Sequence, residues 1–231
     1  ITYYATIKDL RIQSSLLNGG PRCARLFDLS SMFFCEFKNV VFDTLEDCSD
    51  AVVNFNLNSN VWNSVVSFYD CKFHMGSGGG DAIKSTATTA GAPGGLDLTV
   101  RGGRFVGIVG YGINLYNDVV ADPLNHSLNI SDSYMEGCQA GMIRIGSTLY
   151  SVISKVKMEY ATLGKSAVAI DIGRASGTQA GVISIRDCVI GASTGSTEPT
   201  NSPIWFRGYA ADITIDGNRF QGGRQSITNR A

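Results

Sequence analysis

The octapeptide Ile213-Thr-Ile-Asp-Gly-Asn-Arg-Phe220 decides the fold, because its pattern recurs along the chain at intervals of about 30 residues. Apolar and polar residues alternate up to a central position, here Gly217, and another apolar residue follows three positions later. The residues at the central position in the successive copies are Asp9, Asn39, Asp70, Gly102, Asp132, Lys155, Asp187 and Gly217.

The central position predicts a sharp bend. Except for Lys155, its residues are Asp, Asn or Gly, which adopt a left-handed backbone at least cost. The alternation on either side predicts a strand before the bend and another after it. A further apolar-polar-apolar strand follows each copy, as in Ile143-Arg-Ile145 and Ile170-Asp-Ile172.

A single rung of this kind cannot bury its apolar face, whereas stacked rungs can. The sequence therefore predicts an all-β fold, a right-handed parallel β-helix (a solenoid) of about eight rungs with three short strands each. The repeat fills residues 1–231, which we expect to form a single domain. Because neither end carries a cap, we also expect this domain to be a fragment of a longer chain.

Composition narrows the class of protein. Hydrophobic residues make up 44% of the chain and charged residues 17%, which is typical of a folded, β-rich domain. A net charge of −1 favours neither nucleic acid nor an anionic membrane as partner, and the apolar runs are too short for membrane insertion. Cys71 and Cys188 share an inward position but lie several rungs apart, so we expect reduced cysteines, as in a cytoplasmically made protein. Nothing in the spacing of His or Cys predicts a metal or cofactor.

Stacking turns each outward position into a column of side chains. Two columns, one just before the bend and one two residues after it, are rich in cations, and we call them the basic stripe. Such a stripe suits an anionic partner, for example an acidic polysaccharide, or else pairs with acidic loops or a neighbouring subunit. Its cationic members are Lys8, Lys38, Arg101 and Arg186 before the bend, and Arg11, Lys72, Arg104, Lys157 and Arg219 after it.

Glu136 and Glu159 occupy the same outward column, four residues past the bend, on successive rungs. In register their Cβ atoms would lie about 5 Å apart, and repulsion would raise the pKa of one carboxyl. An acid and a carboxylate at that distance are what a retaining glycosidase uses. The alternative is a pair of glutamates directed into water.

The strand after the bend pair contributes a third outward column, and we treat Asp171 in it as a further candidate catalytic carboxylate. Amides, charges and an indole are suited to binding sugars, so Lys84, Asn114, Arg144 and Trp205 are candidate substrate-binding residues. Alternatively, Arg144 and Asp171 form a simple surface ion pair, which contributes little to stability. The whole column is predicted to read Asp28, Asn56, Lys84, Asn114, Arg144, Asp171, Trp205 and Thr228.

The long rungs, the bend signature Asp-Gly-Asn-Arg-Phe220 and the opening Tyr3-Tyr-Ala-Thr-Ile-Lys-Asp-Leu10 resemble the β-helical body of bacteriophage tailspikes and the wider pectate-lyase-like superfamily. The resemblance implies a homotrimer in the virion tail that binds, and as a glycoside hydrolase depolymerises, bacterial surface polysaccharide such as O-antigen or capsule. Two alternatives stay open. One is a non-catalytic trimeric shaft with a structural or adhesive role, and the other is a secreted, extracellular polysaccharide lyase.

Overall fold

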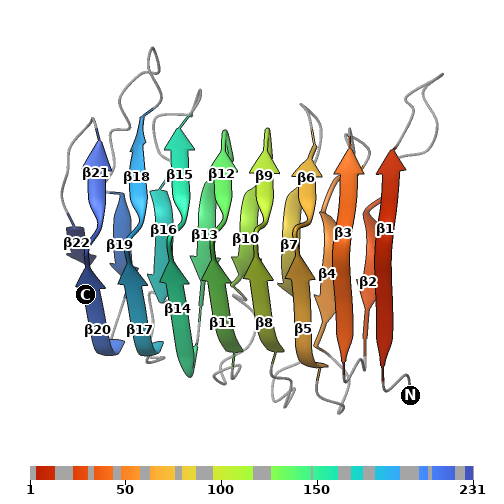
Figure 1. Ribbon diagram of the computed structural model, residues 1–231. Coiled ribbons are helices and arrows are strands. Elements are labelled where there is room, and N and C mark those ends of the chain that lie inside the picture. The colour runs from red at the N-terminus through yellow and green to blue at the C-terminus, as the bar shows by residue number, and fades with distance from the viewer. Residues whose placement is uncertain are drawn as a thin grey trace.

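The computed structural model describes residues 4–13, 23–30, 34–43, 48–57, 63–75, 80–86, 96–116, 126–146, 148–160, 168–173, 180–192, 203–207, 210–221 and 227–230. These residues form strands and short connections without a helix, and the strands stand side by side from β1 at one end to β21 at the other (Figure 1). Accordingly, no helix that could span a membrane occurs in these ranges.

A 14-stranded parallel sheet, which we call the bent sheet, contains two strands of most rungs. The strands before the bend are β1 (Ala5–Gln13), β3 (Cys35–Asp43), β5 (Asn63–Tyr69), β8 (Leu96–Arg101), β11 (His126–Ser131), β14 (Tyr150–Ser154), β17 (Ala180–Arg186) and β20 (Ala210–Asp216), of which β1 and β3 continue through it. The strands after the bend are β6 (Lys72–His74), β9 (Arg104–Val106), β12 (Tyr134–Glu136), β15 (Lys157–Tyr160), β18 (Val189–Ala192) and β21 (Arg219–Gln221).

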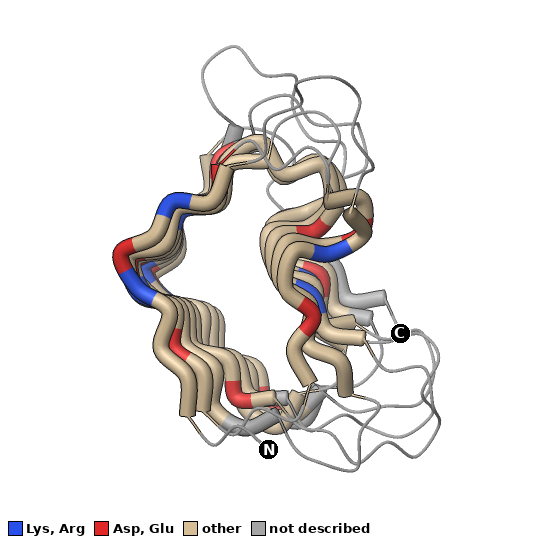
Figure 2. The backbone as a smooth tube through the Cα atoms, turned by 90° about the vertical axis from the view of Figure 1, so that its right-hand side faces the viewer, with Lys and Arg blue, Asp and Glu red and all other residues tan. Residues whose placement is uncertain are grey.

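A second parallel sheet of eight strands faces the bent sheet across the interior, so that the backbone forms a tube when it is viewed along the stack (Figure 2). Its strands are β2 (Arg25–Leu29), β4 (Ala51–Asn56), β7 (Asp81–Thr86), β10 (Tyr111–Leu115), β13 (Gly141–Ile145), β16 (Val168–Gly173), β19 (Ile204–Arg207) and β22 (Ile227–Arg230). The predicted all-β parallel β-solenoid is therefore confirmed. In the part of the chain that the structure describes, the first two rungs have two strands and not the predicted three, because β1 and β3 each run through the bend as one strand.

The bend lies where the repeat places it. All eight central residues have positive φ, between 51° at Asp132 and 67° at Gly102. Only glycine, asparagine and aspartate reach this region at little cost. The bend therefore explains the composition of the column, and it leaves Lys155 (φ 53°) as the one unfavourable member.

Side chains on either side of the bend fill the tube. Phe37 stacks on Phe68 with ring centroids 4.6 Å apart. Phe73 lies between Phe42 and Phe105, at 4.6 and 4.8 Å. All five rings are fully buried, and aliphatic residues continue the same columns in the later rungs. This continuous ladder of like side chains makes the tube a rigid platform for outward-facing groups.

The cysteines are all free, as expected, and those in the core columns are buried. Burial raises the pKa of the Cys35 and Cys71 thiols to about 11. Cys23 and Cys48, on adjacent rungs, place their Sγ atoms 3.6 Å apart.

One detail of the predicted columns is wrong. In the second sheet, Asn54, not Asn56, pairs with Asp28 and Lys84, because the strand β4 is shifted by two residues from the expected alignment. In the bent sheet, Leu10 is the register partner of the buried Val40, and it is 45% exposed because β1 has a neighbour on one side only.

Candidate functional site

The outward side chains of the strands after the bend form a continuous surface, which we call the post-bend face. Two columns cross it in register over several rungs. One column is Val41, Lys72, Arg104, Tyr134 and Lys157, and the other is Asp43, His74, Val106, Glu136 and Glu159.

Glu136 and Glu159 are register partners on β12 and β15, as the sequence predicts. Both side chains converge on the hydroxyl of Tyr134, whose Oη lies 2.9 Å from Glu136 Oε2 and 2.5 Å from Glu159 Oε2. The shared hydroxyl therefore holds the two carboxyl groups within about 5.5 Å of each other, the separation typical of retaining glycosidases. The alternative of two glutamates directed apart into water does not describe this arrangement.

A cation offsets the repulsion between the two carboxylates. Lys157 Nζ lies 2.6 Å from Glu159 Oε1. The hydrogen bond from Lys157 and the one from Tyr134 lower the pKa of Glu159 below its usual range. Glu159 is therefore not the carboxyl whose pKa repulsion within the pair would raise, because Lys157 stabilises its ionised form.

Tyr134 is held in a polarised environment. Partial burial, together with hydrogen bonds to Glu159 and Glu136, raises the pKa of its phenol, so it stays protonated as a donor. The guanidinium of Arg104 and the ammonium of Lys157 each lie 5.5 Å from the ring centroid. The cations of two neighbouring rungs thus flank the phenol that bridges the two carboxylates.

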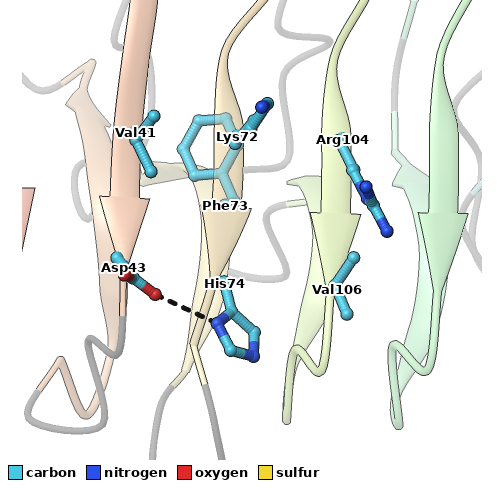
Figure 3. A pocket seen from close by; sticks show the side chains of 7 residues that line it. All are labelled: Val41, Asp43, Lys72, Phe73, His74, Arg104 and Val106. Atoms are coloured by element: carbon cyan, nitrogen blue, oxygen red, sulfur yellow. Dashed lines mark hydrogen bonds and ion pairs between the residues drawn. The ribbon is translucent and has the colours of Figure 1, made fainter. Parts of the chain in front are cut away.

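A second feature of the same face is a hollow of about 330 Å³ over β3, β6 and β9. Its wall contains Asp43, which accepts hydrogen bonds from Arg11 and from His74, the latter at 3.1 Å (Figure 3). These two partners lower the pKa of Asp43. The remaining lining residues are Val41, Lys72, Phe73, Arg104 and Val106.

The basic stripe divides into paired and unpaired cations. Arg11 pairs with Asp43 and Lys157 with Glu159, while Arg101 lies 3.6 Å from Asp132. In contrast, Lys72 and Arg104 form no ion pair with any residue that the structure describes. The expectation that the stripe pairs with acidic neighbours thus holds at several rungs but not in the hollow.

The candidate binding residues of the second sheet lie in one column, in register from Lys84 to Trp205. Most of them already have partners. Lys84 Nζ donates to Asp50 Oδ1 at 2.5 Å, and Asn114 Nδ2 donates to Asp81 Oδ2 at 2.8 Å. Asn114 is buried and Trp205 is half-buried. The column is therefore a hydrogen-bonded ladder, less accessible than the post-bend face.

Asp171 belongs to this ladder and not to the glutamate pair, because it lies on β16 in the second sheet while the glutamates lie on the bent sheet. It is 2% exposed, and its Oδ2 lies 3.7 Å from Arg144 Nε. Arg144 in turn stacks on Tyr116, 3.6 Å from the ring centroid. Arg144 and Asp171 are thus paired as expected, but the pair is largely buried and not on the surface, and it is separate from the other two candidate carboxylates.

Tyr134, Asp43 and His74 were not among the candidate residues that the sequence analysis singled out. Their positions could have been read from the repeat. Tyr134 lies two residues before Glu136 on the same outward face, and His74 is the register partner of Asp43 on the next rung. Another missed residue is Asp81, whose pKa is raised by burial even though Tyr111 N and Asn114 donate to it. Within the described ranges, no group of three or more His, Cys, Asp or Glu is arranged to hold a metal ion.

Comparison with known proteins adds no relative: no family model, no curated protein and no solved structure matches this chain. The tailspike and pectate-lyase likeness therefore extends to the parallel β-solenoid fold alone. Function is inferred below from this fold and from the geometry of the post-bend face.

Proposed function

We propose that this protein binds a bacterial surface polysaccharide and hydrolyses its glycosidic bonds, as a tailspike-like depolymerase. The observation that carries the proposal is the pair Glu136 and Glu159, held by one tyrosine hydroxyl at the separation of a retaining glycosidase. Fold alone would not support it, because solenoids of this type serve many functions.

The electrostatics assign the two roles. The lowered pKa of Glu159 keeps it ionised, so it is the nucleophile that attacks the anomeric carbon. Glu136 protonates the departing glycosidic oxygen as that bond breaks, and the sugar is left as an ester of Glu159. A water molecule then gives its proton to Glu136 and attacks the anomeric carbon, which releases the sugar and restores both carboxyl groups.

Tyr134 acts as a positioning residue in this scheme. Its hydroxyl lies within hydrogen-bond distance of both carboxyl groups and so fixes their orientation. Lys157 preserves the charge of Glu159 before attack. Together the two side chains keep the acid and the nucleophile distinct.

The surroundings of the pair suit a polymer. The post-bend face is an open strip that runs along the stack, where a chain of sugars would cross several rungs spaced about 4.8 Å apart. A polysaccharide could thus be cut internally without threading an end. In this proposal the chain is the body of a homotrimeric spike on a phage tail, a setting supported by its resemblance to tailspikes.

The test is the release of reducing ends from a panel of bacterial O-antigens and capsular polysaccharides. We expect wild-type protein to cleave at least one member of the panel. Glu136→Gln and Glu159→Gln should each lower that activity by a factor of 100 or more, because general acid or base catalysis typically contributes about 10²–10⁴ to the rate. Both variants should melt near the wild-type temperature. Glu36→Gln, before the bend, removes an equal charge and should retain full activity. A wild-type protein that binds a polysaccharide of the panel without cleaving it would instead be a non-catalytic shaft or adhesin.

A further inference from the structure

We infer that the hollow at Lys72 and Arg104 binds the carboxylate of an acidic sugar, so that the polysaccharide recognised by the post-bend face contains uronic acid residues. This inference rests on the proposed function and specifies its substrate class. It depends on a different part of the face from the Glu136 and Glu159 pair.

The first observation is two unneutralised cations side by side. Lys72 on β6 and Arg104 on β9 are register partners, and their side chains are exposed on the same surface (Figure 3). Neighbouring strands place such residues about 4.8 Å apart, and like charges in direct register are destabilising. An anion bound between the two side chains would remove this repulsion.

The carboxylate in the wall of the hollow does not supply that anion. Asp43 is already engaged by the guanidinium of Arg11 and by His74. Among the residues that the structure describes, Lys72 and Arg104 are therefore left without a carboxylate partner, while Asp43 is bonded to Arg11 and His74. The planar guanidinium of Arg104 matches a carboxylate through two parallel hydrogen bonds, while Lys72 adds a point charge.

The walls of the hollow suit a sugar better than a bare ion. Val41 and Val106, on the rungs to either side of Lys72, present apolar surface that the C–H groups of a pyranose ring can cover. The volume of about 330 Å³ is at the lower end of the range for small-molecule sites, which is typically 300–1,000 Å³. An apolar wall beside a few charged groups is the usual composition of such a site.

The hollow is continuous with the glutamate pair. The Arg104 guanidinium lies over the ring of Tyr134, and Val106 is the register partner of Glu136. A polysaccharide with its carboxylate on Lys72 and Arg104 would therefore direct the following sugars over Tyr134 and the two glutamates. The hollow thus selects the substrate and sets its position along the stack.

The test uses uronic acid oligosaccharides from polygalacturonate, hyaluronan and alginate, each beside its carboxyl-reduced, neutral counterpart, with binding to the full chain measured by calorimetry. We expect at least one acidic series to bind about tenfold or more tightly than its neutral counterpart, because a hydrogen bond to a charged group contributes that much. Lys72→Gln and Arg104→Gln should each lose that preference. Lys155→Gln, an equal loss of charge at an exposed bend position outside the basic stripe, should keep it.

The outcomes separate this inference from the proposed hydrolysis. Glu159→Gln should bind the acidic oligosaccharide as wild type does, so binding is measured whether or not cleavage occurs. Equal affinity for acidic and reduced oligosaccharides, or unchanged binding by Lys72→Gln and Arg104→Gln, overturns the inference even if cleavage is found. Inorganic phosphate that displaces the oligosaccharide and binds as tightly would also overturn it, since the hollow would then be a simple anion site.

Discussion

Replacement of Lys155 by asparagine should stabilise the protein. Lys155 is exposed and adopts φ 53° at the bend between β14 and β15, where every other rung has Asp, Asn or Gly. A left-handed conformation costs an ordinary residue about 1–2 kcal/mol, and asparagine much less. No hydrogen bond or ion pair of the Lys155 side chain offsets this cost within the described residues. We therefore expect Lys155→Asn to raise the free energy of unfolding by about 1 kcal/mol.

Chemical denaturation measures this effect. Lys155→Ala removes the same charge but keeps the left-handed cost, so it should stay within about 0.5 kcal/mol of wild type. Gly102→Ala makes the opposite change, because it introduces a Cβ at a left-handed bend position (φ 67°), where that Cβ would also overlap Asp70 Oδ1. It should destabilise by about 1–2 kcal/mol or more. If Lys155→Asn is no more stable than Lys155→Ala, or if Gly102→Ala is neutral, the backbone explanation of the repeat is wrong.

Three further outcomes are expected. Phe73→Ala, which removes the middle ring of a buried stack, should destabilise by about 3–5 kcal/mol in denaturant melts, whereas Phe73→Leu should cost clearly less. Burial raises the pKa of the Cys35 and Cys71 thiols to about 11, so both thiols should resist alkylation at pH 8. The free energy of unfolding should fall between pH 9 and 11, because the thiols ionise first in the unfolded chain. Cys71→Ala should show a smaller fall over that range, and an unchanged slope would contradict the assignment. Lys157→Met removes the main cause of the lowered pKa of Glu159, so the acid limb of the pH–rate profile of hydrolysis should move to higher pH, and an unmoved limb would contradict the role of Glu159.

The architecture was predictable because the left-handed bend limits each rung to a few residue types. Gly217 and the seven equivalent positions are separated by nearly constant steps, so the register of the bent-sheet strands next to the bend follows from aligning them. Glu136 and Glu159 were paired correctly for this reason, across the one short step of the repeat. The second sheet lacks such a marker, and there the alignment of Asn56 slipped by two residues.

Side-chain chemistry was less predictable than register. The repeat predicts which residues are neighbours in a column, but it does not predict the rotamer of each side chain or the hydrogen bonds that result. Tyr134 could have extended along the basic stripe, and only the structure shows its hydroxyl between the two glutamates. Similarly, the direction of the Glu159 pKa depends on the reach of Lys157, two residues away on the same strand. Asp171 was grouped with the glutamates by residue type, although it lies on the other sheet.

The most direct test of the central claim is the anomeric configuration of the first product, followed by NMR spectroscopy while the protein cleaves its polysaccharide. The tyrosine hydroxyl bonded to both Glu136 and Glu159 keeps the two carboxyl groups within about 5.5 Å, closer than the roughly 6.5–9.5 Å at which an inverting enzyme accommodates its attacking water. The account therefore predicts that the configuration is retained and that Glu159→Gln forms no product. Inversion of configuration, or normal turnover by Glu159→Gln, would show that this pair does not cleave the bond.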